Sequence, residues 1–441
     1  MKQSKHNIYY SPKEVRTILE RSIDTALDGL KGYCNDPVSD FTRCRKLPAR
    51  TLIECIMSFS NYSSIGELSH FFAGQGEMPS ASALSQRRQL LDPDIFKRIN
   101  NLFVSAFDDH TTINGYHILA QDGSDVNIPF MNDKTKTEKH DAKSFCQYHV
   151  NALYDCLNKV FYDWSIDAAS KKREVNALIS ILKDRNYPQN SIFTADRGYE
   201  SYNLMAHFIE NDTKFVIRVK DIHTKSGLMT NIKTEEGAFD MRINRTLTSL
   251  QTKEIKADKE KYIFVPTTSN FDFLDENRDF YDLSFRAVRF KISEDTYETV
   301  VTNLSEEEFK TEDFKELYHY RWNEETAFNK LKYTIGLVYF HARKRKLIQQ
   351  EINAAFLMYN VSEVIIRNID LKKNKKPELE YDYKPNFSSA VTNIRLYLRK
   401  KISMKELIHR IKKFLVGQRP ERSFERNIKG QSCKPLNYRT S

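Results

Sequence analysis

The sequence predicts a mixed α/β fold: a core at residues 111–345, with a β-rich insertion at 221–304, lies between helical regions at 1–110 and 346–441. Two observations lead to this fold class. In the flanking regions apolar residues recur at helical spacing, whereas in the core short apolar runs alternate with helical segments. A chain of 441 residues is long enough to form two or three domains with a large hydrophobic core.

The first 110 residues carry helix signals. Ser11-Pro12 is a helix start, and Val15 and Leu19 follow it on one helical face. The same spacing returns at residues 52–57, and residues 80–88 lead into another helix. We therefore expect a helical region before the core.

The core begins near residue 116, where the apolar period changes. Asp122 follows the first predicted strand and Asp196 follows the fourth, at the strand ends where open α/β sheets place functional groups. Each aspartate alone also suits a turn or a helix cap, and for the nearby Asp125 we favour a cap or turn. The predicted elements are, in order, strands 116–121, 148–155 and 159–166, helix 172–185, strand 192–195, helix 202–209 and strand 215–219.

The insertion and the C-terminal region complete the chain. Strands are predicted at 262–266, 283–292 and 296–302, which makes the insertion mostly β. After residue 346 an apolar helix runs to about residue 365, and basic amphipathic segments follow at 394–414.

Composition limits the function classes. No apolar run approaches the roughly 20 residues that a membrane span needs, and the N-terminus lacks the apolar core of a signal peptide, so we expect a cytoplasmic protein without a membrane partner. The six cysteines are scattered without a Cys-x-x-Cys pair, which argues against a zinc site or a disulfide framework.

Positive charge is concentrated at the C-terminus. The net charge is +10, and from Arg343 onward 24 Lys and Arg face 9 Asp and Glu, so that region carries +15 and the preceding residues −5. This asymmetry favours a polyanion partner, most simply nucleic acid, over a solvated basic tail. The N-terminal region also carries basic residues beside Ser and Gln, which suit either DNA contact or a plain helical cap.

Residues 318–332 hold the most distinctive pattern. On a helix, Arg321, Glu325 and Lys332 fall at roughly 300°, 340° and 320° from Tyr318, so four polar groups share a stripe about 60° wide. Leu317, Phe328 and Leu331 form a separate apolar flank at roughly 220–280°. One carboxylate among Tyr, Arg and Lys suits a helix that presents a metal ligand to a phosphodiester. The alternative is a salt-bridged amphipathic helix in which Arg321 and Glu325 simply pair.

Together, Asp122, Asp196 and Glu325 suit metal-dependent phosphodiester chemistry. Such a reaction uses two divalent ions roughly 3.5–4 Å apart, and Mg²⁺ prefers a few carboxylates plus water and phosphate oxygens. Asp122 would bridge both ions, and Asp196 and Glu325 would each complete the protein ligands of one ion. Mn²⁺ is an acceptable substitute.

These motifs resemble the DDE transposases of the bacterial insertion-sequence-four type. The resemblance rests on DGS at Asp122, ADRGY at Asp196 and the ungapped Y-x2-R-x3-E-x6-K spacing from Tyr318 to Lys332. VTNL at residues 301–304, RW at 321–322 and DFTRCRKLP at 40–48 agree with it, so the likeness covers about residues 35–345.

The resemblance implies a ribonuclease H-like core interrupted by the insertion. It also implies cut-and-paste transposition by a homodimer that binds both terminal inverted repeats in a synaptic complex and joins them to target DNA through a hairpin intermediate. Carried onto this sequence, Asp122, Asp196 and Glu325 are the catalytic metal ligands. The DNA contacts are Tyr318, Arg321 and Lys332, with Arg197 and Trp322 from the same motifs. An aromatic residue of the insertion is expected to capture a flipped base; the insertion offers only Phe and Tyr.

Two alternatives stay open at this point. One is a related nuclease that cuts DNA without joining it. The other is a transposase-derived DNA-binding protein that has lost catalysis, although the complete triad and the intact spacing argue against that loss.

Overall fold

The computed structural model describes most of the chain. Outside the described residues lie 5–8, 44, 75, 132, 134, 140–141, 170–173, 223, 225, 267, 270, 295, 372–381 and 419–441. Much of the basic C-terminal tail therefore falls outside them. No described helix has both the length and the apolar character to cross a membrane.

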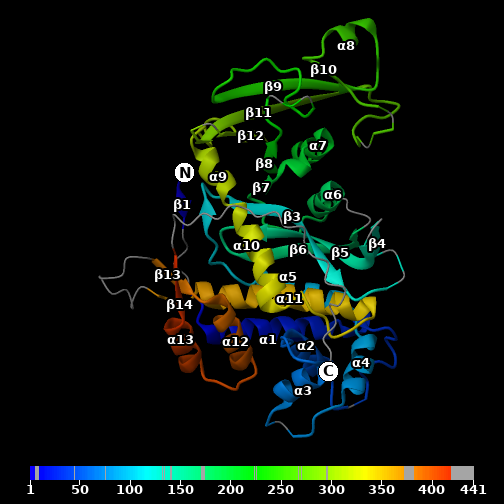
Figure 1. Cartoon of the computed structure of the whole chain (residues 1–441), viewed down its shortest axis with the longest axis vertical. Coiled ribbons are helices and arrows are strands. Elements are labelled where there is room, and N and C mark those ends of the chain that lie inside the picture. The colour runs from blue at the N-terminus through cyan, green and yellow to red at the C-terminus, as the bar shows by residue number, and fades with distance from the viewer. Residues whose placement is uncertain are drawn as a thin grey trace.

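In the described part of the chain a ten-stranded mixed sheet forms the centre of the molecule (Figure 1). β3 (His117–Ile128), β5 (Ala142–Asp155) and β6 (Val160–Ala168) are antiparallel neighbours, with β4 (Lys136–Lys139) on β5. β7 (Ser191–Ala195) and β8 (Lys214–Val219) run parallel to β3 on its other side. The mixed α/β class and the predicted order of core elements are confirmed.

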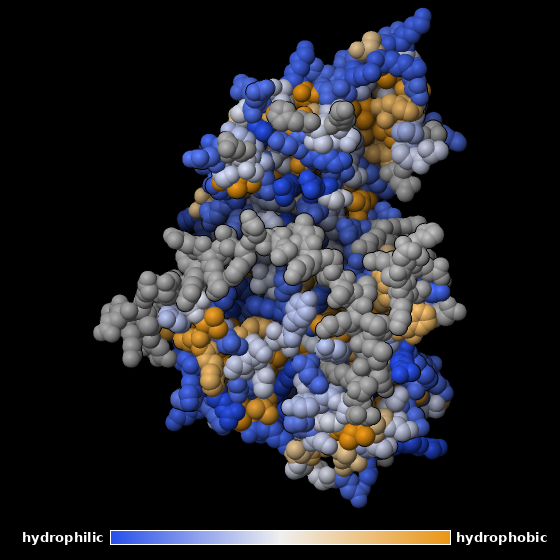
Figure 2. Space-filling view, in the orientation of Figure 1, coloured by the Kyte–Doolittle hydropathy of each residue, from blue (hydrophilic) through white to orange (hydrophobic). Residues whose placement is uncertain are grey.

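The insertion continues this sheet instead of forming a separate one. β12 (Thr296–Thr302) pairs with β8, and β11 (Phe280–Ser293), β9 (Phe239–Thr248) and β10 (Tyr262–Phe264) follow outward, with α8 (Lys253–Ala257) beside them. β9 is not among the predicted strands, although its apolar residues alternate with polar ones as in a half-buried strand, at positions 239, 241, 243 and 247. Figure 2 shows a mainly hydrophilic face with a hydrophobic patch over the upper part, where Figure 1 places the insertion.

The two faces of the sheet pack against different helices. Leu119 of β3, Leu153 of β5 and Phe193 of β7 face a core with α6 (Glu174–Asp184) and α7 (Tyr202–Glu210). Their neighbours Ala120, Ala152 and Ile192 face the opposite core. This alternation assigns every residue of these strands to one of two faces.

The second core is a layer of helices below the sheet in Figure 1. α11 (Arg345–Arg367) packs against β6 and against α1 (Pro12–Asp28), α2 (Ala49–Met57), α4 (Ala81–Leu90) and α5 (Asp94–Val104). Residues 350–365 of α11 are all buried. The two predicted helical regions therefore share one core.

The remaining elements are short or peripheral. α3 (Ser64–Phe72) packs beside α2 and α4, and α12 (Phe387–Leu398) and α13 (Met404–Lys413) complete the layer. β1 (Gln3–Ser4) pairs with β2 (Thr112–Ile113), β13 (Asp382–Pro385) pairs with β14 (Leu415–Gln418), and η1 (Leu30–Tyr33) follows α1.

A buried ion pair ties α4 to α11. Arg88 donates to Glu351 Oε1 at 2.8 Å and to the Leu347 carbonyl at 2.7 Å, and the His341 N–H donates to Glu351 Oε2 at 2.9 Å. Burial alone would raise the pKa of Glu351, but Arg88 and His341 together have the larger effect and lower this pKa to about 2. The charged carboxylate is therefore the form that the fold stabilises.

We expect Arg88→Met to lower the free energy of unfolding by about 3–5 kcal/mol, since it leaves Glu351 charged and buried without its main partner. Urea unfolding followed by fluorescence measures this, because Trp164 stacks on Phe356 of α11 with ring centroids 4.4 Å apart.

The matched control is Arg50→Met. Arg50 pairs with Glu54 at 3.0 Å, but both side chains are more than a third exposed, so its loss is expected to cost below about 1 kcal/mol. Equal effects of the two substitutions would show that the Arg88 pair contributes no more than a surface pair.

Candidate active site

Strand register brings the two motif aspartates side by side. Gln121 of β3 pairs with Ala195 of the parallel strand β7, so Asp122 and Asp196 are the next residue on each strand. Neighbouring strands lie about 4.8 Å apart, which fixes the scale of their separation. The prediction that Asp122 ends its strand is wrong: β3 continues to Ile128 along β5, and Asp122 marks the point where pairing with β7 stops. Asp196 does follow the last residue of β7.

Both aspartates belong to the same face of the sheet. By alternation from Ala120 and Ile192 they point toward the α11 side, away from α6 and α7. Each is held by a local amide: Asp122 Oδ1 accepts the Gly123 N–H and Asp196 Oδ1 accepts the Gly198 N–H, both at 2.8 Å.

The segment predicted as one helix is divided. α9 (Asp313–His319) is followed by a turn at Tyr320 and Arg321 that keeps helical backbone angles, then by α10 (Trp322–Lys330) and a π-helical turn, η4 (Leu331–Ile335). A π turn adds residues per turn, so the 100° arithmetic fails at Lys332. The apolar flank of Leu317, Phe328 and Leu331 is buried as predicted.

Arg321 and Glu325 form the i, i+4 pair that the alternative interpretation required. Arg321 Nη2 donates to Glu325 Oε1 at 3.1 Å. The pair is not a solvated surface feature, because the Arg321 side chain is only 4% exposed and Glu325 31% exposed. The guanidinium also lies over the Trp322 ring, 4.8 Å from its centroid.

The charges of Asp122, Asp196, Glu325 and Arg321 act on one another. The pKa of Asp122 is raised to about 6: burial is the main cause, the charges of Asp196 and Glu325 add to it, and the Gly123 amide and Arg321 oppose them. The structure therefore brings the three predicted carboxylates into one electrostatic neighbourhood, with Arg321 as their cation.

Glu324 is the site residue that the sequence reasoning missed. It is fully buried, and burial, followed by the charge of Asp122, raises its pKa well above the ordinary value. The polar stripe predicted for residues 318–332 does not include Glu324, which lies roughly 100° from Glu325 on the helical wheel. On the same wheel Glu324 falls at roughly 240°, within the apolar flank, and that angle was the available signal of burial.

The other predicted DNA contacts differ in exposure. Tyr318 is buried, and burial raises the pKa of its hydroxyl to about 12. Trp322 is 39% exposed, Arg197 is exposed beside Asp196, and Lys332 is half-buried on the π turn.

The donor chemistry fits hydrated Mg²⁺. Across the described ranges, no group of three or more His, Cys, Asp and Glu side chains has an arrangement that could hold a metal ion by itself. Mg²⁺ commonly keeps several waters and takes one or two carboxylates plus substrate phosphates. The charges of Asp196 and Glu325 raise the pKa of Asp122, and a bound cation would offset this repulsion.

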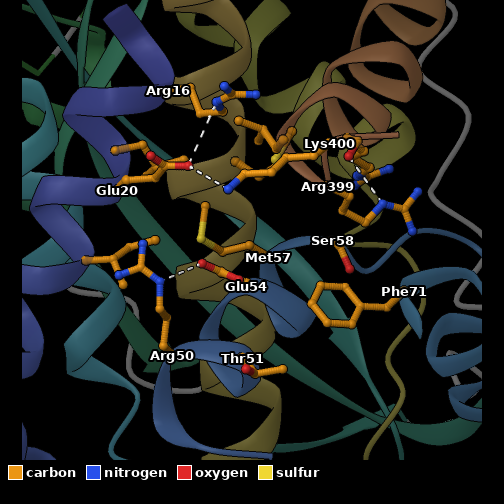
Figure 3. Close-up of a pocket in the computed structure, with 15 residues that line it drawn as sticks. Arg16, Glu20, Arg50, Thr51, Glu54, Met57, Ser58, Phe71, Arg399 and Lys400 are labelled. Carbon is orange, nitrogen blue, oxygen red and sulfur yellow. Dashed lines mark hydrogen bonds and ion pairs between the residues drawn. The ribbon is translucent and has the colours of Figure 1, made fainter. Parts of the chain in front are cut away.

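A separate cavity of about 490 Å³ lies between α1, α2 and α12 (Figure 3). Arg16, Glu20 and Lys400 form a charged row on one side of it, and Arg50 pairs with Glu54 on another. None of the predicted site residues lines this cavity. It is therefore not the candidate active site.

The family model for the "Transposase DDE domain" matches residues 113–361, which is more than half of the chain and includes both aspartates and α10. The chain belongs to this family. Among the solved structures that the chain resembles is a piggyBac transposase synaptic complex with hairpin DNA, at 12% identity and a TM-score of 0.47, over 96% of this chain and 90% of that chain. The search of curated proteins gave no match.

Glu324→Gln is expected to stabilise this transposase increasingly as the pH rises. The unfolded chain ionises Glu324 near its ordinary pKa of 4.5, whereas the folded-state pKa is raised, so wild-type stability is full below pH 4.5 and falls as the pH rises toward the folded pKa. Gln removes this loss, so the melting temperature of the variant should gain on wild type between pH 5 and pH 8.

Glu307→Gln, at an exposed position, is the control and should show no such trend. If Glu324→Gln instead became less stable than wild type at pH 8, Glu324 would be ionised in the folded protein and its assignment as a buried neutral acid would fail.

Proposed function

We propose that this DDE transposase carries out cut-and-paste transposition of a bacterial insertion sequence. It binds the terminal inverted repeats, cleaves the DNA in a metal-dependent reaction and transfers the freed strands to target DNA, through a hairpin intermediate. The observation that carries the proposal is the register that sets Asp122 beside Asp196, with Glu325 and Arg321 close enough to act on the pKa of Asp122.

The strand order supports a ribonuclease H-like core. Three antiparallel strands, β6, β5 and β3, are followed by β7 and β8, which run parallel to β3. The chain segment between β8 and α10 contains the insertion, as the resemblance implies.

Asp122, Asp196 and Glu325 would hold Mg²⁺, with Mn²⁺ as a substitute. When bound, divalent cations supply Lewis acidity at the scissile phosphate and lower the pKa of the attacking water or 3′ hydroxyl. Arg321 fixes the direction of the Glu325 carboxylate through their 3.1 Å contact. Because Arg321 is itself buried, this contact is less screened by solvent than a surface pair.

DNA contacts are assigned to basic and aromatic groups around the carboxylates. Arg197 and Lys332 provide positive charge for flanking phosphates, and Trp322 offers a partly exposed ring. Tyr318 and Arg321 are buried, so in this proposal they pack beneath the carboxylates and hold them in place instead of contacting DNA. The basic C-terminal region adds charge for double-stranded DNA, and the active unit is a homodimer in a synaptic complex.

Cleavage of a labelled duplex that carries the element's terminal repeats tests the proposal. Wild type is expected to nick it with Mg²⁺ and not with EDTA. Glu325→Ala should lower the rate by more than about 100-fold while DNA binding is retained, since loss of a direct ligand exceeds the 10–100-fold typical of outer-shell partners.

Glu307→Gln, at an exposed position outside the site, is the control and should keep its cleavage activity. Equal activity of wild type and Glu325→Ala would mean that another carboxylate completes the site. Tight binding without cleavage by wild type would favour the catalytically silent DNA-binding protein, and normal end cleavage without strand transfer would favour the related nuclease.

Binding to the terminal repeats should weaken steeply with salt. If 6–10 phosphates are neutralised by Lys and Arg, affinity falls about 10³–10⁵-fold between 50 and 200 mM salt. Fluorescence anisotropy with a labelled repeat measures the slope, and an affinity that barely changes over this range would contradict phosphate-led binding.

A further inference from the structure

Three charged side chains from three elements meet on the α6 face of the sheet. His149 of β5 lies between Asp125 of β3 and Glu174 in the first turn of α6. Its Nδ1 is 2.8 Å from Asp125 Oδ1 and its Nε2 is 3.0 Å from Glu174 Oε1. His149 is 1% exposed, whereas the two carboxylates are 27% and 31% exposed. Asp125 is thus a mid-strand partner of His149, and its predicted cap or turn role is wrong.

This group presses against the residue that follows Asp122. A Cβ on Gly123 would lie 2.3 Å from His149 Nε2 and 2.8 Å from Glu174 Oε1, closer than real Cβ contacts allow. The imidazole and the carboxylate therefore occupy the space that any side chain at position 123 would need. Since Gly123 and Asp122 point to opposite faces, the contact supports the backbone of Asp122 from behind.

Glu174 also reaches the turn that carries the second aspartate. Its Oε2 would be 3.9 Å from a Cβ on Gly198, and the Gly198 N–H is the donor that holds Asp196 Oδ1. The two oxygens of one carboxylate thus lie near Gly123, which follows Asp122, and near Gly198, which is two residues after Asp196. Such an arrangement couples the position of strand β3 at Asp122 to that of the turn after Asp196.

Charge balance supports this geometry. Burial lowers the pKa of His149, but hydrogen bonds and charges from Asp125 and Glu174 raise it to about 9, so one cation sits between two carboxylates at neutral pH. The ionic contacts hold β3, β5 and α6 together. A neutral imidazole would leave the charges of the two carboxylates without a cation between them.

We propose that Asp125, His149 and Glu174 form a positioning clamp that fixes the backbone of Asp122 and Asp196 at the spacing required for divalent-cation binding. The inference rests on the proposed function, because it concerns the same metal site. The three residues act through the aspartates and do not touch DNA or metal. Their loss therefore weakens cation binding before it affects DNA affinity.

The test compares full-length wild type with His149→Gln, Glu174→Gln and the double variant. Mn²⁺ binding is measured by electron paramagnetic resonance without DNA, and cleavage is measured as a function of Mg²⁺ concentration. Each single variant should raise the Mn²⁺ dissociation constant and the half-saturating Mg²⁺ concentration by about 10–100-fold, the range typical for outer-shell partners. The double variant should bind Mn²⁺ no more weakly than the weaker-binding single variant, because each single substitution already removes the contact between His149 and Glu174.

His207→Gln is the matched control. His207 is also buried, 5% exposed, and its Nε2 lies 2.7 Å from Asp272, but this pair adjoins neither aspartate. It should leave Mn²⁺ binding, the Mg²⁺ dependence and DNA affinity unchanged. If His149→Gln fails to fold, Glu174→Gln, at a partly exposed position, still tests the clamp.

Each remaining outcome is decisive. If the wild type cleaves DNA and both single variants keep its cation dependence, the clamp is overturned and the proposed function stays intact. The wild type could bind Mn²⁺ without cleaving DNA. If His149→Gln then lost Mn²⁺ binding, the result would support the clamp and count against transposition. Loss in Glu174→Gln alone would make Glu174 a ligand and overturn the positioning role, and a wild type that binds no Mn²⁺ would overturn both proposals.

Discussion

The register between β3 and β7 is the constraint on which the site depends. Because Gln121 pairs with Ala195, the chain must place two aspartates on adjacent strands and on one face. Neighbouring carboxylates repel, and the raised pKa of Asp122 records that repulsion together with burial. The sheet, fixed by hydrogen bonds and by two apolar cores, supplies the stability that holds these charges together.

The helices on the two faces have different tasks. On one face α10 brings Glu325 and the buried cation Arg321 toward the aspartates, and the fully buried Glu324 packs nearby. On the other face α6 contributes Glu174, which lies against Gly123 with His149. The site is therefore assembled between a functional face and a supporting face of one sheet.

The order of the core elements could be predicted because each strand contains a short apolar run and the helices follow a clear period, but β3 and β5 extend well beyond the predicted runs through polar residues. Prediction failed where local pattern and tertiary setting differ. The insertion joins the main sheet through pairing that no local signal encodes. Its strand β9 was not predicted although apolar residues alternate along it, so that omission was avoidable. Within the site, the DGS, ADRGY and Y-R-E-K motifs located the three carboxylates. The π turn at 331–335 and the burial of Glu324 and Tyr318 depend on packing, and motif spacing does not report packing.

The position of α11 sets the timing of folding during synthesis. α1, α2, α4 and α5 are made first, but their apolar faces close on a helix that begins only at Arg345. A ribosome that adds roughly 5–20 residues per second needs on the order of 10–50 s to travel from α5 to α11. During that interval the N-terminal helices expose apolar surface, so the nascent chain is open to aggregation until the helix that completes its core has emerged, and slower synthesis lengthens this exposure.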